Sequence, residues 1–336
     1  MVQFLISSTI LGRFVVLFLQ KCWQHCSAGR LSWRIMGNQT QFSNQQVVDI
    51  GSVLNNPERP LKERFRALFT LKNIGGLTAV KEIANCFKDE SALLKHELAY
   101  CLGQMQDNRA VPYLEAVLKD VHQEAMVRHE AGEALGAIGD EAALPVLESY
   151  VNDPIVEVAE TCQLSVERIK WLKSKNEEKV SSNPYSSVDP APPCPDRSPE
   201  ELRATLLNEE LPLFERYRAM FALRNKGDDQ SILALGNGLQ CKGALFRHEI
   251  AYVLGQIQSP LVIQQLRERL ELPEESEMVR HECAEALGSI AAPECRQILE
   301  AYLKDEARVV KESCEVALDI CEYENSPEFQ YTASLV

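Results

Sequence analysis

In this chain of 336 residues histidines are scarce, and so are cysteines spaced as pairs. The eleven cysteines are an odd number, and none of them forms a CxxC pair. They therefore indicate neither a disulfide framework nor a zinc ribbon, and reduced thiols in the cytosol fit best. The sequence also lacks a glycine-rich phosphate loop, a serine or cysteine nucleophile motif and a basic aromatic RNA-binding pattern. None of these chemistries is indicated.

Positive charge is also in short supply, because 35 basic side chains face 49 acidic ones and the formal net charge is -14. Such a field disfavours nucleic acid and would attract a cationic partner. A solvated acidic surface that keeps the protein soluble is the simpler explanation of the charge alone.

Residues 1–36 differ from the rest of the chain because they contain basic side chains and no acidic one. The first 20 residues are apolar, which raises the hypothesis of a signal peptide or membrane anchor. However, no basic segment precedes the apolar stretch, and Arg13 interrupts it. These features argue against a membrane span, so we treat residues 1–36 as an appendage of undetermined role.

A long internal duplication organises the remaining sequence. The segment PLKERFRALFTLKN at 60–73 returns as PLFERYRAMFALRN at 212–225, with nine of 14 positions identical and an offset of 152. The same offset maps HELAYCLGQMQ onto HEIAYVLGQIQ and VRHEAGEALGAI onto VRHECAEALGSI. The two halves are therefore copies of one unit.

A shorter period appears within each half. Phe65, His96, His129 and Glu160 follow one another at intervals of 31, 33 and 31 residues, and the second copy repeats these intervals. A period of this length is typical of a solenoid, whose units bury their faces only by stacking. The intervals predict eight units, four in each half.

Apolar residues inside a unit follow a helical period. Ala131, Ala134, Leu135 and Ile138 recur at i, i+3, i+4 and i+7, and Gly139 reads as the helix stop. We therefore predict an all-α solenoid of helical hairpins. The predicted segments are an N-terminal appendage (1–36), a four-unit half (37–172), a linker (173–199), a second four-unit half (200–325) and a tail (326–336).

The linker is rich in proline and serine and has almost no apolar periodicity. We expect it to be exposed and partly extended. Its length allows the two halves to pack face to face.

Four of the six histidines occupy one repeated position, and each is followed by a glutamate. The first and last units of each half carry other residues at this position, so His-Glu is not part of the repeat scaffold. These residues are Phe65, Tyr217, Glu160 and Glu312. The dipeptides are His96-Glu97, His129-Glu130, His248-Glu249 and His281-Glu282.

One His-Glu dipeptide cannot form a metal site, because adjacent helical residues point about 100° apart. Equivalent histidines on stacked helices can converge, so we expect His96 with His129 at one ion and His248 with His281 at another. Imidazole and carboxylate ligands without thiolate suit iron or manganese at least as well as zinc. Eight candidate ligands exceed the six that two 2-His-1-carboxylate sets need, so one glutamate in each half is available to bind a cationic amine.

Other repeated residues have structural explanations. The basic residue before each histidine is expected to form an ion pair between units; these residues are Lys95, Arg128, Arg247 and Arg280. Tyr100 and Tyr252 share a helix face with a histidine, where they either support the site or pack between helices.

The motifs KHELAYCLGQ, VRHEAGEALGAIGD, RHEIAYVLGQ and VRHECAEALGSIA closely resemble those of the deoxyhypusine hydroxylase family. The resemblance covers about residues 40–325 and implies HEAT repeats, two irons and a cytosolic location. It also implies that the chain uses molecular oxygen to hydroxylate deoxyhypusine in eukaryotic translation initiation factor 5A.

Carried over by position, the four histidines resemble iron ligands, and Glu130 and Glu282 resemble the carboxylates that complete the two ion sites. Glu97 and Glu249 are either further ligands or the groups that bind the cationic substrate. No catalytic residue is expected beyond the metal centre. The alternative is a non-catalytic HEAT-repeat scaffold with a structural metal.

Overall fold

The computed structural model describes residues 42–174 and 178–325. All regular secondary structure within these ranges is helical, so the all-α prediction is confirmed. No helix among the described residues is both long and apolar enough to cross a membrane. The predicted appendage at 1–36 and the predicted tail at 326–336 lie outside the described residues.

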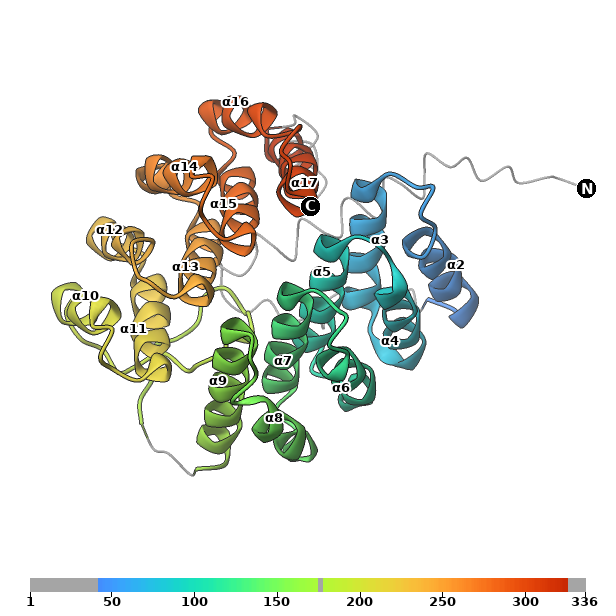
Figure 1. Ribbon diagram of the computed structural model, residues 1–336, viewed down its shortest axis with the longest axis horizontal. Helices are drawn as coiled ribbons and strands as arrows, with labels where there is room; N and C mark the ends of the chain where they lie inside the picture. The colour runs from blue at the N-terminus through green and yellow to red at the C-terminus, as the bar shows by residue number, and fades with distance from the viewer. Residues whose placement is uncertain (1–41, 175–177, 326–336) are drawn as a thin grey trace, which may run out of the picture.

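The α-helices alternate between an outer and an inner position along the chain (Figure 1). The outer helices are α2 (Asn44–Leu54), α4 (Gly76–Ala84), α6 (Val111–Lys119), α8 (Leu144–Tyr150), α10 (Pro199–Leu207), α12 (Asp229–Gly238), α14 (Ile263–Glu271) and α16 (Pro293–Ala301). The inner helices are α3 (Leu61–Ile74), α5 (Ala92–Gln104), α7 (Ala125–Ile138), α9 (Val156–Lys173), α11 (Leu213–Lys226), α13 (Ala244–Ile257), α15 (Glu277–Ile290) and α17 (Arg308–Glu324). Short 3-10 turns adjoin α4, α6, α8 and α14 at Asn85–Lys88, Asn108–Ala110, Glu141–Ala143 and Pro260–Val262.

Helix α7 shows why this sequence forms these elements. Its apolar stripe of Ala131, Ala134, Leu135 and Ile138 is buried. The helix ends where Gly139 adopts a left-handed conformation with φ of 75°, as the sequence predicts. Glycine tolerates this conformation because it has no Cβ.

Consecutive inner helices approach each other very closely. A Cβ added to Gly103 of α5 would lie 2.8 Å from the Cα of Ala134 in α7. In the second half, a Cβ on Gly288 of α15 would lie 2.7 Å from the Cα of Ala317 in α17. The absence of a side chain at these positions brings the repeated positions of neighbouring helices within contact distance.

Ion pairs join successive units at the positions expected from the sequence. Lys95 Nζ lies 2.6 Å from Glu124 Oε2, and Arg128 Nη2 lies 2.6 Å from Asp153 Oδ2. The second half repeats the pattern, with both distances at 2.5 Å; its pairs are Arg247–Glu275 and Arg280–Asp305. The prediction of structural ion pairs is confirmed.

The two halves meet at two seams. The terminal seam joins α3 to α17, and the linker seam joins α9 to α11 (Figure 1). Between the seams, the hydroxyl groups of Tyr100 in α5 and Tyr252 in α13 lie 3.0 Å apart. The halves therefore face each other, with α5 and α7 opposite α13 and α15.

The linker is packed against both halves, and the expectation that it is exposed is wrong for residues 190–194. Pro190, Ala191 and Cys194 are buried, and the side chain of Asp189 makes a bidentate ion pair with Arg224. Because backbone groups here bond to side chains of the helices, a segment without helical periodicity still packs in the interior.

Candidate metal centre

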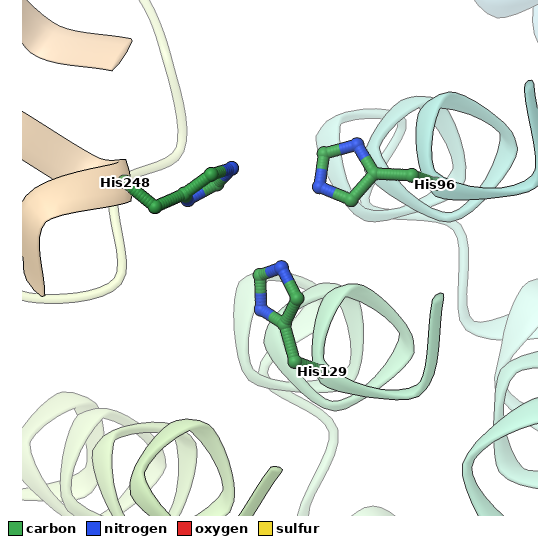
Figure 2. Close-up of side chains that lie close together, drawn as sticks. All are labelled: His96, His129 and His248. Carbon is green, nitrogen blue, oxygen red and sulfur yellow. The ribbon is translucent and has the colours of Figure 1, made fainter. Parts of the chain in front are cut away.

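The four His-Glu dipeptides converge from four inner helices. His96 and His129 lie on α5 and α7, while His248 and His281 lie on α13 and α15. None of the four side chains is more than 5% exposed. Figure 2 shows His96, His129 and His248 pointing toward one another from the two halves. The two central units of each half therefore contribute to one buried cluster.

The imidazoles form a single compact group rather than two well-separated pairs. The ring centroids of His96 and His129 are 5.5 Å apart, and those of His248 and His281 are 5.3 Å apart. Distances across the halves are similar, at 5.2 Å for His96–His281 and 5.3 Å for His129–His248. Two ions held here would lie close to each other.

Potential ligand atoms also group across the halves. One nitrogen each of His96, His129 and His248 lie within 4.8 Å of one another. A second group with the same spread combines His248, His281 and Glu282. Each half therefore places imidazoles within reach of the other, which the half-by-half assignment from the sequence does not anticipate.

Carboxylates of the dipeptides are buried beside these rings in a pseudo-symmetric pattern. Glu130 Oε2 lies 3.2 Å from His96 Nε2, and the equivalent Glu282 Oε2 lies 3.5 Å from His248 Nε2. Glu97 Oε1 lies 3.4 Å from His96 Nδ1. The fourth carboxylate, Glu249, is 2% exposed, and its Oε1 atom has no hydrogen-bond partner among the described residues.

Sequence reasoning missed two further carboxylates, Glu133 and Glu285. Glu285 Oε1 lies 3.6 Å from His281 Nδ1, and Glu133 groups with His129 and Glu130 as a possible ligand set. Both follow a histidine by four residues and therefore share its helix face. Their equivalence at the offset of 152 residues was the signal that could have identified them.

The last unit of each half supports this cluster with a hydroxyl group instead of contributing an imidazole. Thr161 Oγ1 lies 3.4 Å from His129 Nδ1, and Ser313 Oγ donates to Glu285 Oε1 at 3.2 Å. Both residues directly follow the glutamate that occupies the histidine position in the last unit of its half. These hydroxyl groups restrain the orientation of a ring and a carboxylate.

Most of the ring nitrogens lack a hydrogen-bond partner in the described part of the chain. They are Nε2 of His129 and both ring nitrogens of His96, His248 and His281. Buried polar atoms of folded proteins are nearly always satisfied, so a cluster of exceptions requires an explanation. Metal ions provide one, because each accepts lone pairs from imidazole nitrogens and carboxylate oxygens. The donor set therefore fits bound metal.

The electrostatics of the protein alone also favour bound cations. Burial raises the pKa of Glu249 to about 8 and that of Glu285 to about 7, and it also raises the pKa of Glu282 well above its usual value. Burial lowers the pKa of His129, and the neighbouring imidazoles lower it further. For His96, burial also lowers the pKa, but Glu130 and Glu97 outweigh it and hold the pKa above its usual value. Metal cations would stabilise the ionised carboxylates that burial otherwise disfavours.

A cavity of about 230 Å³ leads from this cluster to the terminal seam. Glu97, Glu130, Glu249 and Glu282 line its inner part, together with His96 and His248. Phe65, Tyr100, Tyr252 and Val316 supply apolar and aromatic wall. Residues of α9 and α11 are absent from the lining that the described chain provides. The cavity therefore combines a carboxylate-rich end with a passage lined by apolar, aromatic and charged side chains.

Comparisons with known proteins agree with the repeat architecture. The HEAT-repeat family model matches residues 80–165. The model of the PBS lyase HEAT-like repeat matches residues 215–241, 246–271 and 279–305.

Several similar proteins share one name. The chain is 62% identical to deoxyhypusine hydroxylase of Danio rerio over 88% of this chain and 97% of that protein. It is 61% identical to deoxyhypusine hydroxylase of Drosophila melanogaster over 87% of this chain and 97% of the relative. The structure of human deoxyhypusine hydroxylase in complex with glycerol has 58% identity, covers 84% of this chain and 97% of its own, and gives a TM-score of 0.81.

Proposed function

The chain belongs to the deoxyhypusine hydroxylase family, and we propose that it uses two ferrous ions and molecular oxygen to hydroxylate deoxyhypusine in eukaryotic translation initiation factor 5A. It is an oxidoreductase that acts on a protein substrate. Family membership decides against the non-catalytic scaffold. The observation that carries the metal assignment is the cluster of buried, unpartnered imidazole nitrogens at the end of a cavity.

We assign the four histidines as iron ligands, together with Glu130 and Glu282. Their support is the short distance from each of these glutamates to a histidine of the preceding unit, His96 or His248. Imidazole and carboxylate ligands suit iron and leave coordination positions open for other molecules. Two sets in one buried cluster favour a dinuclear centre.

Glu97 and Glu249 are proposed as further ligands or as the groups that bind the cationic arm of deoxyhypusine. Both line the cavity, and Glu249 retains a buried oxygen without a hydrogen-bond partner in the described chain. A buried carboxylate oxygen binds an ammonium group strongly because the hydrogen bond is charge-assisted. The position of Glu249 in the cavity lining supports an arm that ends at its carboxylate.

Iron, when bound, supplies the redox chemistry that activates dioxygen for insertion into a C–H bond. The chain's own residues bind the substrate arm, align it and exclude water. Phe65 and Val316 surround the apolar part of the arm, while the inner carboxylates fix its charged end. This arrangement presents one C–H bond to the metal centre and shields it from solvent.

We expect the enzyme in the cytoplasm. All nine cysteines of the described ranges are free and buried, as expected of a protein that is kept reduced. Cys101, Cys162, Cys283 and Cys314 pack in the hydrophobic core.

The test is incubation of the purified protein with the deoxyhypusine form of the translation factor, with hypusine as the measured product. His129→Ala removes a buried ligand and should abolish hydroxylation and lower the iron content. The control is His122→Ala, because His122 is exposed and lies outside the cluster. Full hydroxylation and unchanged iron in His129→Ala would contradict the ligand assignment.

A further inference from the structure

A chain of hydrogen bonds runs from the linker to the cavity. The carboxylate of Asp189 accepts two hydrogen bonds from Arg224, at 2.8 and 2.6 Å. Arg224 Nη1 also donates to Gln256 Oε1 at 2.9 Å. Gln256 Nε2 donates to the hydroxyl of Tyr252 at 3.0 Å, and this hydroxyl lies 3.0 Å from that of Tyr100. The network thus connects the linker, the second half and the first half.

The direction of this network is fixed by its chemistry. A guanidinium group has only donors, so the atom of Gln256 that faces Arg224 must be the amide oxygen. The amide nitrogen must then face Tyr252, where it occupies a lone pair of the hydroxyl oxygen. Because Arg224 is fully buried and held by Asp189, the amide of Gln256 cannot reverse without losing this bond.

Counting protons then leaves one unused donor in the tyrosine pair. The two hydroxyl groups carry two protons, and the contact between Tyr100 and Tyr252 uses one of them. Gln256 donates a hydrogen bond to the pair and accepts none from it. The other phenolic proton finds no acceptor in the part of the chain that the structure describes, and both tyrosines line the cavity.

We propose that the Tyr100–Tyr252 pair is a hydrogen-bond donor of the site, which binds the oxygen atom that the reaction adds to the substrate side chain. This inference rests on the proposed function, because hydroxylation is what supplies an oxygen acceptor in the cavity. The linker has a role in it: Asp189 holds Arg224, Arg224 orients Gln256, and Gln256 keeps the pair from donating to the protein. The pair then acts as one donor that either hydroxyl can present.

Phenylalanine substitutions test the pair because the account predicts a non-additive result. In Tyr100→Phe the hydroxyl of Tyr252 keeps its proton for the cavity, and in Tyr252→Phe the hydroxyl of Tyr100 does so. Each single variant should retain hydroxylation within about threefold. The double variant has no donor and should lose at least about tenfold in kcat, the usual effect of removing one buried hydrogen bond.

Gln256→Glu provides an isosteric test that keeps both tyrosines. A carboxylate at this position accepts from Arg224 and also accepts the proton of Tyr252, whose oxygen then accepts the proton of Tyr100. Both phenolic protons are used within the protein, so this variant should lose as much activity as the double variant. Thermal unfolding checks that each variant is folded.

Binding to the metal-free protein gives a readout that does not depend on turnover. The hypusine product carries one more hydroxyl group than the deoxyhypusine substrate. Titration calorimetry should show product affinity falling about tenfold in Gln256→Glu and in the double variant, with substrate affinity changed less than threefold. Equal losses for both molecules, or no loss for either, would overturn the inference. An inactive wild type would instead contradict the proposed function and leave this binding comparison intact.

Discussion

The two seams between the halves are made of equivalent helices, but of these seam helices, among the described residues, only those of the terminal seam line the cavity. Arg66 of α3 and Arg218 of α11 occupy the same repeat position. Arg66 crosses the terminal seam to Asp319 of α17 at 2.5 Å, and its side chain is 34% exposed. Arg218 is 10% exposed and contacts the linker instead, through Glu178 and the carbonyl of Pro192.

The linker explains this difference. It is attached to α9, where Arg168 donates to the carbonyl of Asp189 at 2.8 Å, and to α11 through the Asp189–Arg224 ion pair. It therefore covers the linker seam and leaves the terminal seam as the route to the metal centre. A duplicated sequence can thus give an asymmetric site, because the segment that joins the copies occurs once.

The largest effect is expected at the linker seam. Asp189→Ala leaves the fully buried Arg224 without its carboxylate, so the free energy of unfolding should fall by about 3 kcal/mol. The matched change at the terminal seam, Asp319→Ala, removes the partner of a partly exposed arginine and should cost about 1 kcal/mol or less. Chemical denaturation measures both. Equal losses would show that the linker does not stabilise its seam preferentially.

A charge reversal tests which seam admits the substrate. Asp319→Lys places a cation beside Arg66 and Lys62 at the cavity, where it should repel a cationic side chain and loosen the seam. We expect kcat/KM to fall about tenfold at low salt and to recover partly at high salt. Glu167 is the equivalent residue of α9, so Glu167→Lys should change kcat/KM less than about twofold. A larger loss in Glu167→Lys would place the route at the other seam.

A smaller difference lies near the N-terminal ends of α3 and α11. Arg64 of α3 pairs with Asp89 at 2.5 Å, whereas Arg216 of α11 meets Cys241 at the equivalent position and keeps Nη2 unpartnered among the described residues. Cys241→Asp should therefore stabilise the protein by about 1 kcal/mol at pH 7. Asp89→Cys is the converse control and should destabilise it.

The gain should also depend on pH. Burial alone would raise the pKa of Asp89, but Arg64 outweighs it and holds the pKa below its usual value of 3.8. A carboxylate with a lowered pKa stabilises the fold above the unfolded pKa, and this stability is lost as the pH falls through the folded pKa. Unfolding measured from pH 7 to about pH 2 should show the Cys241→Asp gain beginning to shrink once the pH falls below about 4, the usual pKa of an unfolded aspartate. A gain that stays unchanged below about pH 4 would contradict the ion-pair explanation.

The sequence predicted the parts of the molecule that repeat. The offset of 152 residues and the apolar stripe of α7 gave the helical solenoid, and the restriction of His-Glu to inner units located the buried cluster. The ion pairs of Lys95 and Arg128 were predicted as well, because a repeated basic residue needs a repeated partner.

The parts that occur once, or that depend on the meeting of the halves, were not predictable in this way. Asp189 lies in a segment without periodicity, and only the packed structure shows that it holds Arg224. The bond between Tyr100 and Tyr252 joins residues 152 positions apart, so no local pattern records it. Glu133 and Glu285 were not predicted because they lie one helical turn after His129 and His281, outside the repeated His-Glu dipeptide.

The central claim is that imidazoles from both halves hold two irons in one buried cluster. Quantitative metal analysis of the purified protein, combined with Mössbauer spectroscopy, tests it most directly. The account predicts about two irons per chain that are magnetically coupled, because ligands of both halves are intermixed. One tightly bound zinc per chain, or two irons that behave as independent mononuclear sites, would contradict it.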